Sequence, residues 1–324
     1  MKHILITGAT GQIGSELTLA LRARYRAEEV VASGRKHPPS QAIKESGPFV
    51  YLDVTDQDAL AEVVSSHKID TIYHLASLLS AVAEGHPQLA WQINMAGLTN
   101  VLEVARQHGC ALFFPSSIGA FGPTTPRDHT PQDTLQQPTT IYGITKLSGE
   151  LLCNYYHQRF GVDSRGVRFP GLISHITKPG GGTTDYAVEI FHAALGGETY
   201  RCFLKADSRL DMMYMPDAIR AAITLMEADS STLLHRNGYN ITAMNFTPDE
   251  LAAAIRRHIP GFTIDYNTID PVRQAIADSW PHSMDDSVAR REWGWRPRFS
   301  LDEMVADMLA NLAKAMNKPG GRDE

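Results

Sequence analysis

Apolar runs and helical patterns alternate along the first half of the chain. Short, nearly continuous runs of Val, Ile, Leu and Phe predict strands, and apolar residues at helical spacing predict helices between them. The predicted strands are 3–7, 29–32, 49–52, 71–75, 111–115 and 164–169, and the predicted helices are 13–25, 57–66, 91–108 and 142–160. This alternation is typical of a parallel sheet that helices cover on both faces. We therefore expect an α/β domain with a doubly wound parallel sheet over residues 1–170.

The alternation ends near residue 170. Further helical patterns lie at 184–195, at 216–227, after Thr247 and from about residue 301. Thr247 followed by Glu250 three residues later is the signature of a helix N-terminus, whereas the glycine-rich stretch 178–185 is expected to be a loop. Residues 171–324 are expected to form mainly a smaller lobe, with some segments returning to pack on the first domain.

Three glycines follow the first predicted strand. Gly8 allows a sharp turn, Gly11 leaves room for a pyrophosphate, and Gly14 lets the next helix pack against the strand. The N-terminus of that helix would present free backbone N–H groups to phosphates. A glycine triplet alone is weak evidence, but the strand before it and the helix after it together predict a dinucleotide-binding (Rossmann) domain.

Charge and cysteine content narrow the choice of partner and compartment. The net charge of −6 over 324 residues argues against nucleic acid or an anionic membrane as a partner. No apolar run approaches the ~18–20 residues that span a bilayer, and the chain reaches its first strand too early for a signal peptide. Cys110, Cys153 and Cys202 are spaced for neither a disulfide framework nor a zinc site. We expect a cytoplasmic protein without a bound metal.

Tyr142 and Lys146 lie four residues apart at the start of a predicted helix, so they share one helix face. A free tyrosine has a pKa near ~10, and a nearby ammonium group lowers it. Tyr142 could then act as a general base toward a substrate hydroxyl. The same spacing is common in surface pairs of amphipathic helices, and only the glycine motif upstream favours catalysis here.

Two serines end the fifth predicted strand, at the sheet edge where open α/β sheets bind ligands. We expect Ser117 to hold the substrate oxygen near Tyr142, and Ser116 to shape the turn that follows.

Taken together, these motifs resemble those of the extended short-chain dehydrogenase/reductase family. The resemblance rests on T-G-x-x-G-x-x-G at 7–14, Asp53-Val54, His74-Leu75-Ala76, Asn94, Ser116-Ser117 and the Tyr142–Lys146 pair. It implies that Asp53 binds the adenine, that Asn94 lies beside the nicotinamide half, and that Lys146 also holds the nicotinamide ribose. The cofactor contacts it implies are Gly8, Gly11, Gln12, Ile13, Gly14, Gly34, Arg35, Asp53, Val54, Leu75, Ala76, Asn94, Tyr142, Lys146 and Leu172.

Motifs in the second half are similar to those of the epimerase-type L-threonine 3-dehydrogenases. They are Gly181 to Tyr186, Leu210 to Asp217, and Asp278 to Pro281. This resemblance implies NAD-dependent oxidation of the L-threonine β-hydroxyl to 2-amino-3-oxobutyrate by a homodimer built on helices 91–108 and 142–160. The substrate contacts it implies are Ser80, Ser117, Tyr142, Thr183, Thr184 and Trp280.

Several alternatives stay open at this point. Thr183 and Thr184 could instead cap the helix that follows them, and Trp280 could be a core anchor. Residues 33–36 read Ser-Gly-Arg-Lys where an acidic residue would bind the ribose of NAD. Taken alone, that segment slightly favours NADP, whereas the subfamily resemblance favours NAD, which we expect. A nucleotide-sugar epimerase, dehydratase or reductase, or a non-catalytic NAD(P)-binding regulator, are the other functions compatible with this fold.

Overall fold

Seven parallel strands form the central sheet, in the order β10-β6-β5-β4-β1-β2-β3. The computed structural model describes residues 1–177, 180 and 182–316. The order reverses between β1 and β4, and this reversal is the switch point at which ligands bind in open α/β sheets. The strands are β1 (Ile4–Thr7), β2 (Val30–Gly34), β3 (Phe49–Tyr51), β4 (Thr71–His74), β5 (Ala111–Ser117), β6 (Ser164–Phe169) and β10 (Tyr239–Asn240).

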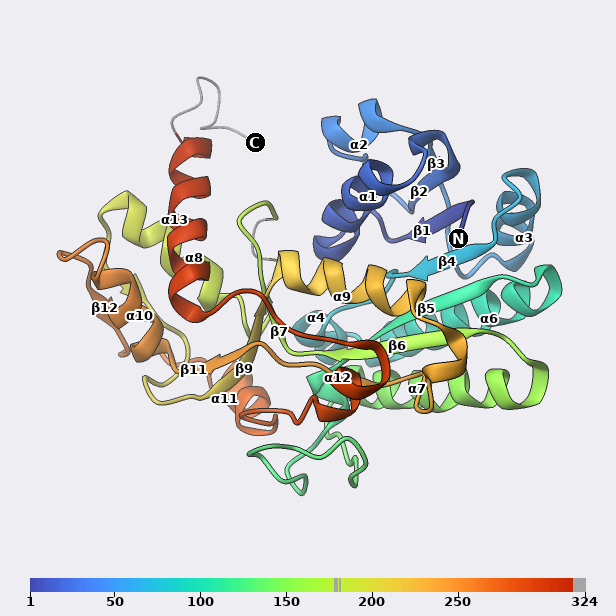
Figure 1. Cartoon of the computed structure of the whole chain (residues 1–324). Coiled ribbons are helices and arrows are strands. Elements are labelled where there is room, and N and C mark those ends of the chain that lie inside the picture. Colours follow the sequence, from blue (N-terminus) through green and yellow to red (C-terminus); the bar gives the residue numbers. More distant parts are fainter. Residues whose placement is uncertain (178–179, 181, 317–324) are drawn as a thin grey trace.

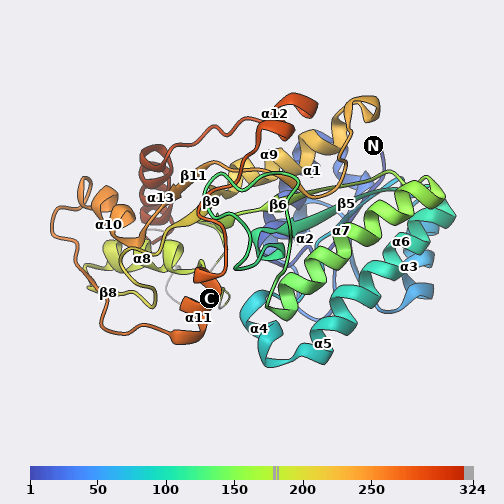
Figure 2. The same ribbon diagram turned by 90° about the horizontal axis from the view of Figure 1, so that it is seen from below.

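Helices cover both faces of this sheet, as the strand sequences require (Figure 2). Successive strand residues point to opposite faces. Leu5 and Val31 therefore pack in one apolar cluster, while their neighbours Ile4 and Val30 pack in the other. The first cluster lies under α3 (Gln57–Ser66), α6 (Gly97–His108) and α7 (Ile141–Phe160), and the second lies under α1 (Gln12–Arg24) and α9 (Met215–Glu227).

The turn between β1 and α1 is tight. Gly8 has φ +71°, and a Cβ atom there would lie 2.7 Å from the backbone nitrogen of Ala76. A Cβ atom at Gly14 would lie 2.2 Å from the carbonyl oxygen of Gly8. Both positions therefore require glycine, for the reasons that the sequence motif predicts.

The residues after β6 build most of the lobe beside the sheet (Figure 1). Its three-stranded sheet has the order β11-β9-β7, and α8 packs against α10 and α13. Its elements are β7 (Gly171–Ile173), α8 (Tyr186–Gly196), β8 (Tyr200–Arg201), β9 (Leu210–Tyr214), β11 (Met244–Phe246), α10 (Pro248–Arg256), β12 (Ile264–Asp265), α11 (Pro271–Asp278) and α13 (Leu301–Met316). Two later elements return to the first domain, because α9 packs on α1 and β6, and β10 extends the large sheet.

Most predicted elements are confirmed, and the differences are local. The predicted helix 91–108 is a longer helical stretch in which α5 (Pro87–Trp91) and a π-helical turn (Gln92–Ala96) precede α6. The prediction missed α2 (Gln41–Ser46), α4 (Ser80–Gly85), α11 and α12 (Ser287–Trp293), which are too short for a clear helical period. It also missed the short strands β7 to β12, among them β10 of the central sheet. The capping box of Thr247 and Glu250 is present. Across the described residues, no helix is both long and apolar enough to cross a bilayer.

Candidate active site

A groove runs along the carboxyl ends of the strands, at the switch point between β1 and β4. It has two parts, of about 240 Å³ and about 220 Å³, that share Gly8, Gly11 and Leu75 in their walls. A Cβ atom at Gly11 would meet only the Gly8 carbonyl oxygen, at 3.3 Å, so the turn leaves the groove open at this point. The shape and the glycines fit a dinucleotide that lies across the ends of the strands.

The first part of the groove lies beyond the end of β2. Asp53 accepts hydrogen bonds from the backbone nitrogen and the hydroxyl of Thr55, at 3.0 and 2.7 Å. Its other oxygen faces Arg35, 3.7 Å from the guanidinium. The residues expected here are all in the wall: Gly34, Arg35, Asp53, Val54 and Ala76.

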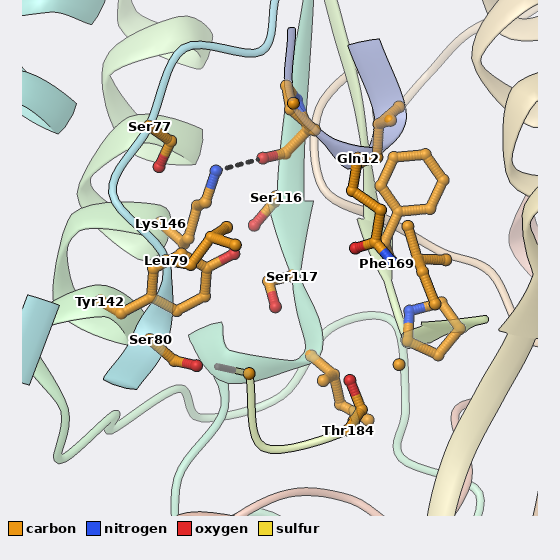
Figure 3. A pocket seen from close by; sticks show the side chains of 18 of the residues that line it. Gln12, Ser77, Leu79, Ser80, Ser116, Ser117, Tyr142, Lys146, Phe169 and Thr184 are labelled. Carbon is orange, nitrogen blue, oxygen red and sulfur yellow. Dashed lines mark hydrogen bonds between the residues drawn. The ribbon is translucent and has the colours of Figure 1, made fainter. Parts of the chain in front are cut away.

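The second part contains Ser117, Tyr142 and Lys146 (Figure 3). Ser117 is the last residue of β5, and its hydroxyl accepts a hydrogen bond from Gly119 at 3.1 Å. Thr140 caps the N-terminus of α7. Tyr142 and Lys146 lie in the first two turns of this helix, and both line the same cavity. The Lys146 ammonium donates to the Pro115 carbonyl at 2.8 Å and lies 5.4 Å from the centre of the Tyr142 ring. Two hydroxyl groups and a cation therefore meet where a substrate oxygen could sit.

Burial dominates the pKa values of Tyr142 and Lys146. It raises the pKa of the Tyr142 phenol to about 12, and the Ser117 hydroxyl acts in the opposite direction by hydrogen bonding. Burial also lowers the pKa of Lys146 to about 8, against the attraction of the Glu150 carboxylate. In this structure burial dominates the pKa of Tyr142, while the Lys146 ammonium bonds to the Pro115 carbonyl. The expected lowering of the Tyr142 pKa by Lys146 stays a prediction.

Behind the cavity, Glu150 and Arg168 form a buried ion pair at 2.8 Å, with side chains only 4% and 7% exposed. Glu150 lies two turns after Tyr142 on α7, and Arg168 lies on β6. The Ser116 hydroxyl donates to the same carboxylate. The ion pair therefore joins β6 to α7, and the Ser116 hydrogen bond ties the end of β5 to the same carboxylate.

The far end of the cavity is lined by hydroxyl groups and an aromatic wall. Ser80 is the first residue of α4, and Trp280, 6% exposed, forms part of the wall. Thr183 is 1% exposed, and within the described part of the chain its hydroxyl has no hydrogen-bond partner. Asp185 is the N-cap residue of α8, so the idea that Thr183 and Thr184 cap this helix is wrong. A buried hydroxyl without a partner is costly unless a ligand satisfies it.

Nearly all the other expected contacts line the groove as well, namely Gln12, Ile13, Gly14, Leu172 and Thr184. The exception is Asn94, which lines neither large part. Its side chain accepts from the Leu78 nitrogen at 2.8 Å and donates to the Thr145 hydroxyl at 3.1 Å, so it holds the loop after β4 against α7. It lines instead a small adjoining cavity, whose wall also includes Ala76, Ser77 and Lys146. Its expected place beside the nicotinamide half stays a prediction.

Sequence reasoning missed several wall residues: Thr10, Lys36, His37, Ser77, Leu79, Ile118 and Asp185. Most of them are next to a predicted contact in the sequence. Extending each predicted contact to its neighbours in the turn after the strand would have found them. The described residues contain no group of three His, Cys, Asp or Glu side chains that could hold a metal ion.

Comparisons with known proteins agree with this geometry. The model of the NAD dependent epimerase/dehydratase family matches residues 4–242. An uncharacterized epimerase/dehydratase of Staphylococcus haemolyticus is 53% identical over 319 residues, which cover 98% of this chain and 100% of the relative. The L-threonine dehydrogenase of Clostridium difficile has a TM-score of 0.95 at 55% identity, covering 97% of this chain and 98% of its own. The holo form of a GalE-like L-threonine dehydrogenase from Cupriavidus necator has a TM-score of 0.93 at 57% identity, covering 96% and 99%.

Proposed function

Because this chain belongs to the NAD dependent epimerase/dehydratase family, we propose that it oxidises the β-hydroxyl of L-threonine with NAD, forming 2-amino-3-oxobutyrate. The observation that carries the proposal is the cavity in which Ser117, Tyr142 and the unpartnered Thr183 hydroxyl face one small volume beside the dinucleotide groove. The likeness to L-threonine dehydrogenases at 55–57% identity supports this choice of substrate.

The residues of the groove fit the cofactor. Gly11 leaves room for its pyrophosphate at the N-terminus of α1, and Gly8 and Gly14 allow the tight turn that places this helix end there. We expect Lys146 to hold the nicotinamide ribose. When bound, NAD supplies the hydride acceptor. The chain's own residues bind the amino acid and accept its proton.

Tyr142 is the general base for the β-hydroxyl proton, and Ser117 orients that hydroxyl. Ser80, Thr183 and Thr184 offer hydroxyl donors to the substrate carboxylate, since Lys146 is the only basic side chain among the described residues of this cavity wall. Trp280 and the neighbouring apolar residues exclude water, which strengthens these polar contacts.

The direct test is the formation of reduced nicotinamide on mixing the purified protein with NAD and L-threonine. D-threonine, L-allo-threonine and a UDP-hexose serve as matched substrates. We expect turnover with L-threonine alone. Epimerisation of the UDP-hexose without threonine oxidation would instead support the nucleotide-sugar function, and no turnover with any of them would contradict the proposal.

The pH dependence of kcat/KM follows from the shifted pKa values of Tyr142 and Lys146. The base form of Tyr142 becomes more populated as the pH rises toward its pKa of about 12, while Lys146 loses its charge above its pKa of about 8. If the active form has a phenolate and an ammonium, kcat/KM should rise about tenfold per pH unit below pH 8 and then level off. A steady-state profile that is flat or falls between pH 6 and 8 would contradict this assignment.

Thr183→Val replaces the unpartnered hydroxyl by a methyl group of similar size. We expect KM for L-threonine to rise roughly 10- to 100-fold, since a hydrogen bond to a charged group contributes about 1.5–3 kcal/mol. Thermal stability should stay equal or increase, because the folded protein no longer buries an unpaired hydroxyl. Thr199→Val, at a surface pair with Thr263, is the control. An unchanged KM would remove Thr183 from the substrate site.

We also infer a homodimer. α7 packs against α4 and α5, and these three helices expose several large apolar side chains that a second copy could cover. These side chains are Val82, Leu89, Trp91, Ile144, Leu151, Tyr155 and Phe160. Sedimentation should give twice the chain mass, and Leu151→Glu should shift the protein toward a monomer. A monomeric wild-type protein at micromolar concentration would contradict the inference.

A further inference from the structure

The end of β2 carries basic residues where NAD-specific sites carry an acid. In dinucleotide-binding folds, an Asp or Glu about 20 residues after the glycine motif binds the ribose hydroxyls of NAD, while a nearby Arg accommodates the 2′-phosphate of NADP. Here the strand ends in Ser33 and Gly34, and Arg35, Lys36 and His37 follow. All three basic residues line the first part of the groove.

The geometry puts this segment beside the β1–α1 turn. Ser33 pairs with Thr7 in the parallel register of β2 and β1, so the residues after it lie next to the glycine turn. A Cβ atom at Gly34 would lie 3.0 Å from the Thr10 side chain. A side chain at this position would therefore crowd Thr10, and this chain offers the ribose no acid from β2.

The charge of this wall is positive. Arg35 is 48% exposed, and its guanidinium lies 3.7 Å from Asp53, longer than a hydrogen bond. Asp53 is the only carboxylate among the described residues that line this part, and Thr55 already holds one of its oxygens. The wall thus carries one carboxylate, two full positive charges and a histidine, and the donors of Arg35 have capacity for an anion.

We propose that this groove also accepts NADP, with Arg35 binding the 2′-phosphate and Lys36 adding to the positive field. The proposal rests on the proposed function only in taking the groove as the site of the redox cofactor. A guanidinium pairs with a phosphate through two parallel hydrogen bonds, and the fork of Arg35 suits that geometry. The 2′-phosphate would meet a basic wall rather than the repelling carboxylate that makes other sites selective for NAD.

Direct binding tests the proposal without any turnover. Calorimetric titration of the full-length protein with 2′,5′-ADP and with 5′-ADP measures the contribution of the 2′-phosphate alone. We expect 2′,5′-ADP to bind at least as tightly as 5′-ADP. Arg35→Ala should weaken 2′,5′-ADP at least about tenfold more than 5′-ADP. The control is Arg257→Ala, which removes a similarly exposed arginine that pairs with one carboxylate, Asp302, on the lobe.

Kinetics with both cofactors completes the test. We expect kcat/KM for NADP to be more than one tenth of the value for NAD, and the NADP/NAD ratio to fall at least about tenfold in Arg35→Ala. A smaller wild-type ratio, weaker binding of 2′,5′-ADP than of 5′-ADP, or equal losses with both ligands in Arg35→Ala would overturn the proposal. Absence of threonine oxidation together with the expected binding would contradict the proposed substrate and leave the phosphate site standing.

Discussion

Tyr142→Phe should lower kcat for L-threonine by about 10²- to 10⁴-fold, the usual contribution of a positioned general base. The substitution removes one oxygen atom from a half-buried ring in the cavity wall, 5.4 Å from the Lys146 ammonium, and it should leave the packing of α7 unchanged. Pre-steady-state formation of reduced nicotinamide measures the effect on the chemical step itself, separately from product release.

The control for this variant lies on the same helix. Tyr155 is 52% exposed on α7 and is not part of the cavity wall. Tyr155→Phe keeps the ring that we assign to the dimer interface and removes only its hydroxyl, so this variant should retain wild-type turnover. Both variants should keep the melting temperature of the wild type. Turnover by Tyr142→Phe within about tenfold of the wild type would identify another group as the base.

Glu150→Ala should destabilise the protein by about 3–5 kcal/mol, because it leaves the Arg168 guanidinium buried without its counter-charge. Arg168 donates to Glu150 from two of its nitrogens, at 3.0 and 2.8 Å. Its other acceptors are uncharged oxygens of Gln132, Gln136 and Asn240, which cannot replace the carboxylate's charge. Urea denaturation, monitored by tryptophan fluorescence, gives the free energy of unfolding. Asp302→Ala removes the carboxylate of an exposed ion pair and should leave that free energy nearly unchanged.

The same variant has a second, more specific readout. Glu150 raises the pKa of Lys146 against the effect of burial, so its removal should let that pKa fall. The pH at which kcat/KM levels off should then move down. A stability loss below about 1 kcal/mol would show that the Glu150–Arg168 pair is not effectively desolvated.

The parallel sheet and the groove could be predicted because their signals are local. Gly8 and Gly14 are required by contacts within one strand–turn–helix unit, and the Tyr142–Lys146 spacing is set by one helix. The expected resemblance to the extended short-chain dehydrogenase/reductases and to L-threonine dehydrogenases is confirmed by the family match and by the solved structures.

The features of the site that could not be predicted from the sequence depend on contacts between distant segments. Glu150 and Arg168 look like ordinary charged residues until α7 and β6 pack together and bury them. The raised pKa of Tyr142 likewise follows from burial by several elements. The bonds of the Asn94 amide to Leu78 and Thr145 could not be foreseen either, since Thr145 is 51 residues away in the chain.

The path of the chain between sheet and lobe limits how this protein can be divided. The chain enters the lobe after β6, returns as α9 and β10 to pack beside α1 and β6, and leaves again at β11. A cut near residue 170 would therefore strip the large sheet of an edge strand and a covering helix. Cofactor and substrate halves are thus not interchangeable modules, and a chimera with a relative should keep α9 and β10 from the parent that supplies β1 to β6.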